Sequence, residues 1–167
     1  MADHAQINSR SEVRFRVATA ADRPQLIPLI NAAFSIEKFI DGTRSDEEHL
    51  AATMEKGSIL VGEDGSGFML ACVYMEFLGS RGYLGMLAVD PAHQGKGLGR
   101  IMVEAAEERF RSAGCEAVDI TVLNLRPELP PIYRRLGYVE TGIADFQPSR
   151  KIVPGVECYG INMSKKL

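Results

Sequence analysis

The sequence predicts a mixed α/β fold in which about four helices pack on a twisted sheet of about seven strands. Short apolar runs typical of strands alternate with stretches whose apolar residues recur at helical spacing. Between residues 83 and 123, one strand passes through a glycine-rich loop directly into a helix and then into another strand. Such a succession usually forms a right-handed crossover, so these two strands are predicted to lie parallel.

The 167 residues, 46% of them hydrophobic, are enough for one domain with its own core. Residues 1–11 are polar and unpatterned, so we expect a mobile arm there and a single domain over residues 12–167. The formal net charge of -3 argues against a general affinity for nucleic acid or for an anionic membrane.

The three cysteines are widely spaced and form neither a disulfide framework nor a metal-ligand pattern, and the three histidines do not indicate a metal site. Residues 1–14 lack the apolar core of a signal peptide. The longest apolar run, residues 68–75, is too short to span a bilayer. We therefore expect a cytoplasmic protein that uses no metal.

The first elements follow from alternation and capping signals. A strand over residues 15–17 precedes a helix that opens with Thr19 and Asp22, which are spaced as in a capping box. Ser45, with Glu48 three residues later, predicts the start of a second helix. The remaining predicted elements are a hairpin over 58–62 and 67–78, the strand from 83, a helix that ends at Gly114 and carries Glu107 on its charged face, a strand over 117–123, a short helix over 130–136 and closing strands over 138–144 and 157–163.

Residues 35–44, between the first two predicted helices, mix charged and apolar side chains in a way that is unusual for a connector. Two of them, Phe39 and Ile40, either close a substrate pocket or cover the core beneath the loop, and we favour the pocket. The residues expected to contact substrate are Phe34, Glu37, Phe39, Ile40, Arg44 and Tyr83.

Three glycines, Gly95, Gly97 and Gly99, separate the strand that begins near Tyr83 from the following helix. Glycine lets the backbone approach a ligand closely, and the first N–H groups of a helix have no intrahelical partner. The loop therefore predicts an anion site of phosphate size.

Two common phosphate-binding motifs fit this loop poorly. A P-loop requires Lys and then Ser or Thr after its last glycine, whereas Gly99 is followed by Arg100 and Ile101. A dinucleotide fingerprint requires a third small residue where Arg100 stands. The spacing of Gln94, Gly97 and Gly99, preceded by LAVDP, instead resembles the central motif of the GNAT superfamily of acyl-CoA-dependent N-acetyltransferases.

A second segment, Tyr133-Arg-Arg-Leu-Gly-Tyr138, resembles the tyrosine signature of the same family, and the order of predicted elements matches over residues 13–164. The resemblance implies a GNAT-like fold with splayed central parallel strands and acetyl-CoA (coenzyme A) as co-substrate. The implied cofactor contacts are Leu87, Ala88, Val89, Gln94, Gly95, Lys96, Gly97, Leu98, Gly99, Arg100, Asn124, Arg126 and Tyr133.

The resemblance also implies direct attack of a substrate amine on the thioester, with the Leu87 N–H as oxyanion donor and Tyr133 as general acid. The general base does not carry over, because Tyr83 stands where many members have a carboxylate. Glu76 is the first candidate base, and Glu37 the second. Arg126 replaces an asparagine of many members, and it contacts either the cofactor or an acidic group of the substrate.

The predicted function is therefore an N-acetyltransferase that acts on a primary amine of a small molecule, with a homodimer possible. Alternatives are a protein or peptide N-acetyltransferase and a non-catalytic acyl-CoA-binding or regulatory module. A nucleotide-binding oxidoreductase, which would bind dinucleotide better than CoA, is a remote third class.

Overall fold

The computed structural model describes residues 12–145 and 150–167, so the predicted mobile arm over residues 1–11 lies outside the described residues. The elements are, in chain order, β1 (Arg14–Val17), the 3-10 helix η2 (Ala20–Asp22), α1 (Arg23–Ala33), α2 (Glu47–Lys56), β2 (Ser58–Glu63), β3 (Met69–Leu78), β4 (Arg81–Val89), the 3-10 helix η3 (Pro91–His93), α3 (Leu98–Ser112), β5 (Ala117–Leu123), α4 (Leu129–Arg135), β6 (Val139–Ala144) and β7 (Gly160–Lys166). Among these elements, no helix has the length and apolar character needed to cross a membrane.

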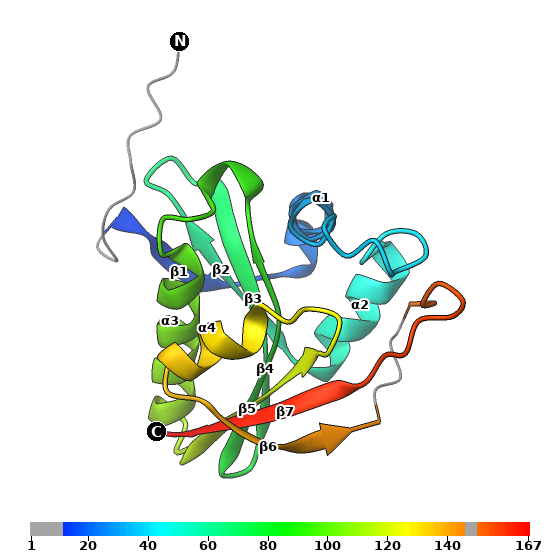
Figure 1. The fold of residues 1–167 in the computed structure, drawn as a ribbon. Helices are drawn as coiled ribbons and strands as arrows, with labels where there is room; N and C mark the ends of the chain where they lie inside the picture. The colour runs from blue at the N-terminus through cyan, green and yellow to red at the C-terminus, as the bar shows by residue number, and fades with distance from the viewer. Residues whose placement is uncertain (1–11, 146–149) are drawn as a thin grey trace.

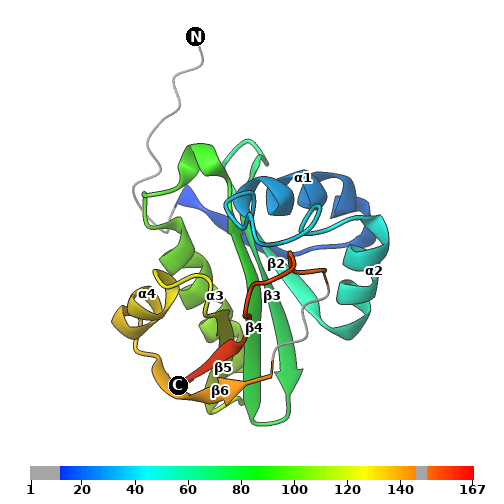
Figure 2. The same ribbon diagram turned by 45° about the vertical axis from the view of Figure 1, so that its right-hand side comes forward.

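The strands form one mixed sheet of seven strands, in the order β1-β2-β3-β4-β5-β7-β6. Strands β4 and β5 are parallel, as predicted, and the other neighbours are antiparallel. Helices α1 and α2 cover one face of the sheet, and α3 and α4 cover the other (Figures 1 and 2). The fold therefore has three layers and two cores, one on each face of the sheet.

The two cores differ in the helices that close them. On one face, Leu26 and Ile30 of α1 and Leu50 of α2 are fully buried against the sheet. On the other face, Met102 and Phe110 of α3 are likewise fully buried. Burial of one such side chain contributes about 1.5–3 kcal/mol, so these positions hold the helices to the sheet.

The central strands separate part of the way along their length. The parallel pairing of β4 with β5 runs from Arg81 and Ala117 to Leu84 and Ile120, and it stops there although both strands continue. This confirms the predicted splay of the central strands.

A bulge in β4 lies directly beyond the last parallel pair. The β3 register shifts there, so that Met86 and Leu87 of β4 oppose the single residue Val73 of β3. Met86 has a φ of 47°, which a residue with a Cβ rarely adopts. Because a bulge takes a residue out of the regular ladder, the backbone at Met86 and Leu87 turns away from its ordinary course beside the gap.

The capping prediction at the first helix is confirmed, and the one at the second helix is wrong. The Asp22 carboxylate accepts a hydrogen bond of 2.7 Å from Thr19 N–H. At α2, Asp46 and not Ser45 is the N-cap, and its carboxylate accepts from His49 N–H at 2.8 Å. Ser45 is buried, and its backbone C=O and N–H are both hydrogen-bonded to the side chain of Asn31.

Glu107 is buried and does not belong to the solvent face of α3, which corrects the predicted pattern. It accepts hydrogen bonds from the Tyr138 hydroxyl at 3.0 Å and from Lys165 Nζ at 2.8 Å. A buried carboxylate is tolerated only when it is paired in this way. The last strand, predicted over 157–163, begins and ends later, at Gly160 and Lys166, because Asn124 engages Glu157 and Tyr159 before β7 begins.

Replacing Lys165 by methionine should leave Glu107 buried without its cation and lower the free energy of unfolding by about 3 kcal/mol. Methionine keeps the aliphatic packing that the lysine stem provides. Urea denaturation measures the change, and Lys166→Met, an exposed position on the same strand, is the control expected within about 0.5 kcal/mol of wild type. Equal effects of the two substitutions would contradict this role of Glu107.

Candidate active site

A cavity of about 670 Å³ lies where β4 and β5 separate. Its walls come from both faces of the sheet. Leu87, Leu129 and Tyr133 pack with the core on the α3 and α4 side, whereas Phe34 and Tyr83 pack with the core on the α1 and α2 side. The gap between the strands therefore connects the two faces.

The glycine loop forms one end of the cavity. Gly95 and Gly97 have φ values of +76° and +80°, the left-handed region that glycine enters without a Cβ penalty. Gly97 is the N-cap of α3, and as a glycine it has no side chain that could cap the helix. The first N–H groups of α3 therefore lie beside the cavity without an acceptor from the N-cap residue. The site residues that line this end are Leu87, Val89, Gln94, Gly95, Gly97, Leu98, Gly99 and Arg100.

These features fit the pyrophosphate of a coenzyme A molecule. A helix N-terminus with open N–H groups favours an anion, and the positive end of the helix dipole adds to this preference. Gln94 Nε2 donates to Val89 C=O at 3.1 Å and so ties the start of the loop to the end of β4. Arg100 and Arg135 contribute positive charge to the lining.

Tyr133, on α4, lines the cavity between its two ends. Its ring meets the Tyr138 ring edge-on, with 5.6 Å between centroids. Burial raises the pKa of Tyr133 to about 12, so the hydroxyl stays protonated at neutral pH. Gly137 follows the C-cap of α4 and has a φ of +97°. The chain turns at this glycine, so that the Tyr138 ring packs against the Tyr133 ring.

The other end of the cavity is lined by five of the six predicted substrate residues. Phe34, Glu37, Ile40, Arg44 and Tyr83 are all part of the wall. Ile40 also forms an isolated bridge with Ile152, which joins the connector of α1 and α2 to the segment that precedes β7.

Glu37 is buried in this wall and is joined to the opposite side of the cavity. Its Oε1 accepts a hydrogen bond of 2.9 Å from Arg126. Arg126 also pairs with Glu128 at the start of α4, so its guanidinium links α4 to the connector that carries Glu37. Thus Arg126, which lines the cavity, is held by two carboxylates of the chain.

Five predicted site residues are not among those that line the cavity: Phe39, Glu76, Ala88, Lys96 and Asn124. Ala88 is fully buried on the α1 and α2 side of the sheet. Asn124 binds the backbone of residues 157–159, and Glu76 accepts a hydrogen bond of 2.9 Å from the Tyr74 hydroxyl. Glu76 is the cross-strand neighbour of Tyr83, which itself lines the cavity.

The lining residues that were not predicted from the sequence include Thr121 and Arg150. Thr121 on β5 lines the cavity and donates its hydroxyl hydrogen bond to Asn162 Oδ1 at 2.9 Å, while burial raises the pKa of Tyr83 in the same wall. Arg150 reaches the wall from the loop after β6. Alternating burial along β5 could have indicated Thr121, whereas no local signal marked Arg150. Within the described ranges, no group of three His, Cys, Asp or Glu residues is arranged to hold a metal ion.

Comparison with known proteins identifies the family. The model of the acetyltransferase (GNAT) family matches residues 24–138. Glucosamine 6-phosphate N-acetyltransferase 1 of Oryza sativa subsp. japonica is 32% identical over 108 residues, which cover 60% of this chain and 64% of that protein. Mycothiol acetyltransferase of Propionibacterium freudenreichii subsp. shermanii is 34% identical over 74 residues, which cover 42% of this chain and 24% of that protein. The matches thus span less than two thirds of these relatives' own length.

Solved structures show the same fold at low identity. Spermidine N-acetyltransferase from Vibrio cholerae, in complex with CoA and spermine, superposes with a TM-score of 0.73 at 16% identity, covering 93% of this chain and 96% of that one. Phosphinothricin acetyltransferase from Sinorhizobium meliloti, in complex with AcCoA, gives a TM-score of 0.71 at 16% identity, with 93% and 89% covered. On the family match and this shared fold, the chain belongs to the GNAT family of acetyltransferases.

Proposed function

We propose that this protein is an acetyl-CoA-dependent N-acetyltransferase that acetylates a primary amine of a small molecule. The observation that carries the proposal is the cavity in the gap between β4 and β5, which runs from the open N-terminus of α3 to a polar wall on the other face of the sheet. In support, related folds have been solved with CoA and with AcCoA. A cytoplasmic location is part of the proposal, and the three free cysteines are consistent with it.

Acetyl-CoA would supply an activated acetyl group as a thioester. For its phosphates, the chain offers the backbone N–H groups of residues 94–100, and for its pantetheine arm the edge of β4 at Leu87 and Val89. The bulge at Met86 and Leu87 turns the Leu87 N–H out of the regular ladder, which suits it to donate to a developing oxyanion.

The proton transfers are assigned to two side chains on opposite sides of the gap. Tyr133 keeps its proton at neutral pH and is proposed to donate it to the departing thiolate. The attacking amine must lose a proton, and Glu37 is proposed to accept it, because Glu37 lines the cavity and Glu76 does not. Amine nitrogen forms a bond to the acetyl carbon while the bond from carbon to sulfur breaks.

A non-catalytic acyl-CoA-binding module remains the competing hypothesis from another class. Such a module would bind CoA without consuming its thioester. The test is therefore release of free CoA thiol from acetyl-CoA when amines are supplied, with CoA binding measured in parallel. Binding without thiol release from any amine would overturn the enzyme proposal.

Gly97→Ala should weaken CoA binding about tenfold, because alanine resists the left-handed conformation that presents the loop N–H groups. Gly67→Ala is a matched control, since Gly67 has a φ of +85°, close to the +80° of Gly97, and neither glycine has a heavy atom within 4 Å of an added Cβ. Both variants should lose about 1 kcal/mol of stability. Calorimetric titration with CoA checks the difference, and equal affinities of the two variants would exclude the loop from binding.

Tyr133→Phe should lower kcat by about 100-fold and leave CoA affinity nearly unchanged, because only the donated proton is lost. The pKa of Tyr133 is raised to about 12, above the ordinary tyrosine value of about 10. The hydroxyl of the wild-type enzyme should therefore still be protonated at about pH 10, and turnover should not fall at that pH because this proton is lost. Tyr138→Phe removes a neighbouring hydroxyl bound to Glu107 and serves as control, with turnover retained. Unchanged turnover in Tyr133→Phe would remove this residue from the mechanism.

Glu37→Gln should reduce kcat/KM by about 100-fold, because glutamine cannot accept the amine proton. The same change at Glu76 should reduce it by less than about threefold, since Glu76 does not line the cavity. Steady-state kinetics at several pH values measures both variants. The opposite order of effects would assign the base to Glu76.

A further inference from the structure

Two buried polar atoms have no hydrogen-bond partner among the described residues, Glu37 Oε2 and Arg44 Nε, and both belong to the half of the cavity that is lined by the predicted substrate residues. Buried polar atoms are nearly always hydrogen-bonded, and an unpaired one costs about 1–3 kcal/mol. Both residues line the cavity. One wall therefore holds an unpaired carboxylate oxygen of Glu37 and an unpaired N–H of Arg44. A ligand that carries both a hydrogen-bond donor and an anionic group could pair with both.

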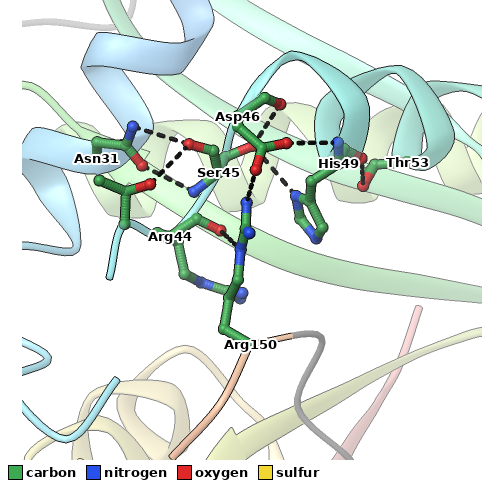
Figure 3. Close-up of polar contacts among 8 residues, drawn as sticks. Asn31, Arg44, Ser45, Asp46, His49, Thr53 and Arg150 are labelled. Atoms are coloured by element: carbon green, nitrogen blue, oxygen red, sulfur yellow. Dashed lines mark hydrogen bonds and ion pairs between the residues drawn. The ribbon is translucent and has the colours of Figure 1, made fainter. Parts of the chain in front are cut away.

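The backbone around Arg44 is fixed by a network of side chains (Figure 3). Asn31 of α1 holds both backbone groups of Ser45, donating to its C=O at 2.9 Å and accepting from its N–H at 2.8 Å. Asp46 caps α2, and Arg150 donates to the Asp46 carboxylate at 2.7 Å and to the Arg44 C=O at 3.3 Å. Arg44 therefore projects from a segment that is tied to α1, to α2 and to the loop before β7.

The Arg44 side chain is held over the Phe34 ring, but no carboxylate of the described residues forms an ion pair with it. Its guanidinium carbon lies 5.0 Å from the centroid of the Phe34 ring, which is a cation–π distance. In residues 12–145 and 150–167, no carboxylate forms an ion pair with it. Burial lowers the pKa of Arg44, yet a guanidinium remains charged at neutral pH.

The other charged side chains of this half already have partners. Arg126 is paired with Glu37 and Glu128, and Arg150 is paired with Asp46. Glu37 is the one carboxylate among the described residues that line the cavity, whereas three arginines, Arg44, Arg126 and Arg150, line this half of it. A ligand that carried several positive charges would meet this excess of guanidinium groups at close range, which is unfavourable.

We propose that the acceptor is a primary amine that also carries an anionic group, which Arg44 binds while Glu37 Oε2 receives the amine. This inference rests on the proposed acetyl transfer. The anion is a carboxylate or a phosphate, both of which a guanidinium binds through two parallel hydrogen bonds. The ligand class is thus an amino acid or a phosphorylated amine, and polyamines are disfavoured.

The test compares short amines that differ in one group: ethanolamine as the neutral reference, β-alanine for the carboxylate, phosphoethanolamine for the phosphate and ethylenediamine for a second cation. Release of CoA thiol gives kcat/KM for each amine. We expect at least one anionic amine to exceed ethanolamine by about tenfold or more, because a charged hydrogen bond is gained. The two anionic amines distinguish a carboxylate from a phosphate source.

The variant Arg44→Gln should lose about 10- to 100-fold in kcat/KM for the preferred anionic amine and less than about threefold for ethanolamine. Arg44→Lys keeps the charge without the planar fork and should recover part of the loss. Arg23→Gln removes an arginine that pairs with Glu47 outside the cavity and should behave as wild type. Thermal denaturation verifies that each variant is folded.

Calorimetric binding of the same amines to the CoA-loaded protein separates this inference from the proposed function. Binding of an anionic amine that depends on Arg44, without thiol release from any amine, would support the subsite and overturn acetyl transfer. Faster acetylation of ethanolamine or ethylenediamine than of both anionic amines would overturn the subsite and support acetyl transfer. Turnover or binding of anionic amines that is unchanged in Arg44→Gln, or no binding of either anionic amine, would also overturn the subsite.

Discussion

Strands β4 and β5 exchange hydrogen bonds only as far as Leu84 and Ile120, and beyond that pair their facing edges have no strand partner. Backbone polar groups in the interior of a protein require partners, so such a gap persists only where a ligand or water can supply them. Each strand keeps its outer neighbour, since β4 still pairs with β3 and β5 with β7. The rest of the sheet therefore stays intact around an opening in its middle.

The two helical layers convert this opening into a cavity with unlike ends. On the α3 and α4 side, the wall includes the glycine loop at the start of α3 and the Tyr133 side chain. On the α1 and α2 side, it consists of charged side chains, of which Glu37 and Arg44 keep unpaired atoms. A ligand common to a whole family suits the first wall, whereas the second wall can differ from protein to protein.

The elements predicted most accurately from the sequence were those with local signals. The glycine loop, the helix behind it and β5 follow from spacing over a few residues, and the strand over 117–123 has the predicted bounds. The errors involve distant partners or competing caps. Glu107 is buried because Tyr138 and Lys165 meet it from 31 and 58 residues away, and Arg150 reaches Asp46 across 104 residues. At α2, two neighbouring residues offered a capping oxygen, and only the backbone conformation selects Asp46.

The short bridge between Ile40 and Ile152 has a consequence for how this protein can diversify. The connector of α1 and α2 and the segment before β7 meet there, and both lie outside the seven-stranded sheet. Insertions or substitutions in these two segments would leave the glycine loop and the strand pairing as they are. On the proposed assignment of the site, acceptor preference and acyl-donor binding are carried by separate parts of the chain, so evolution or a protein engineer can alter the first without rebuilding the second.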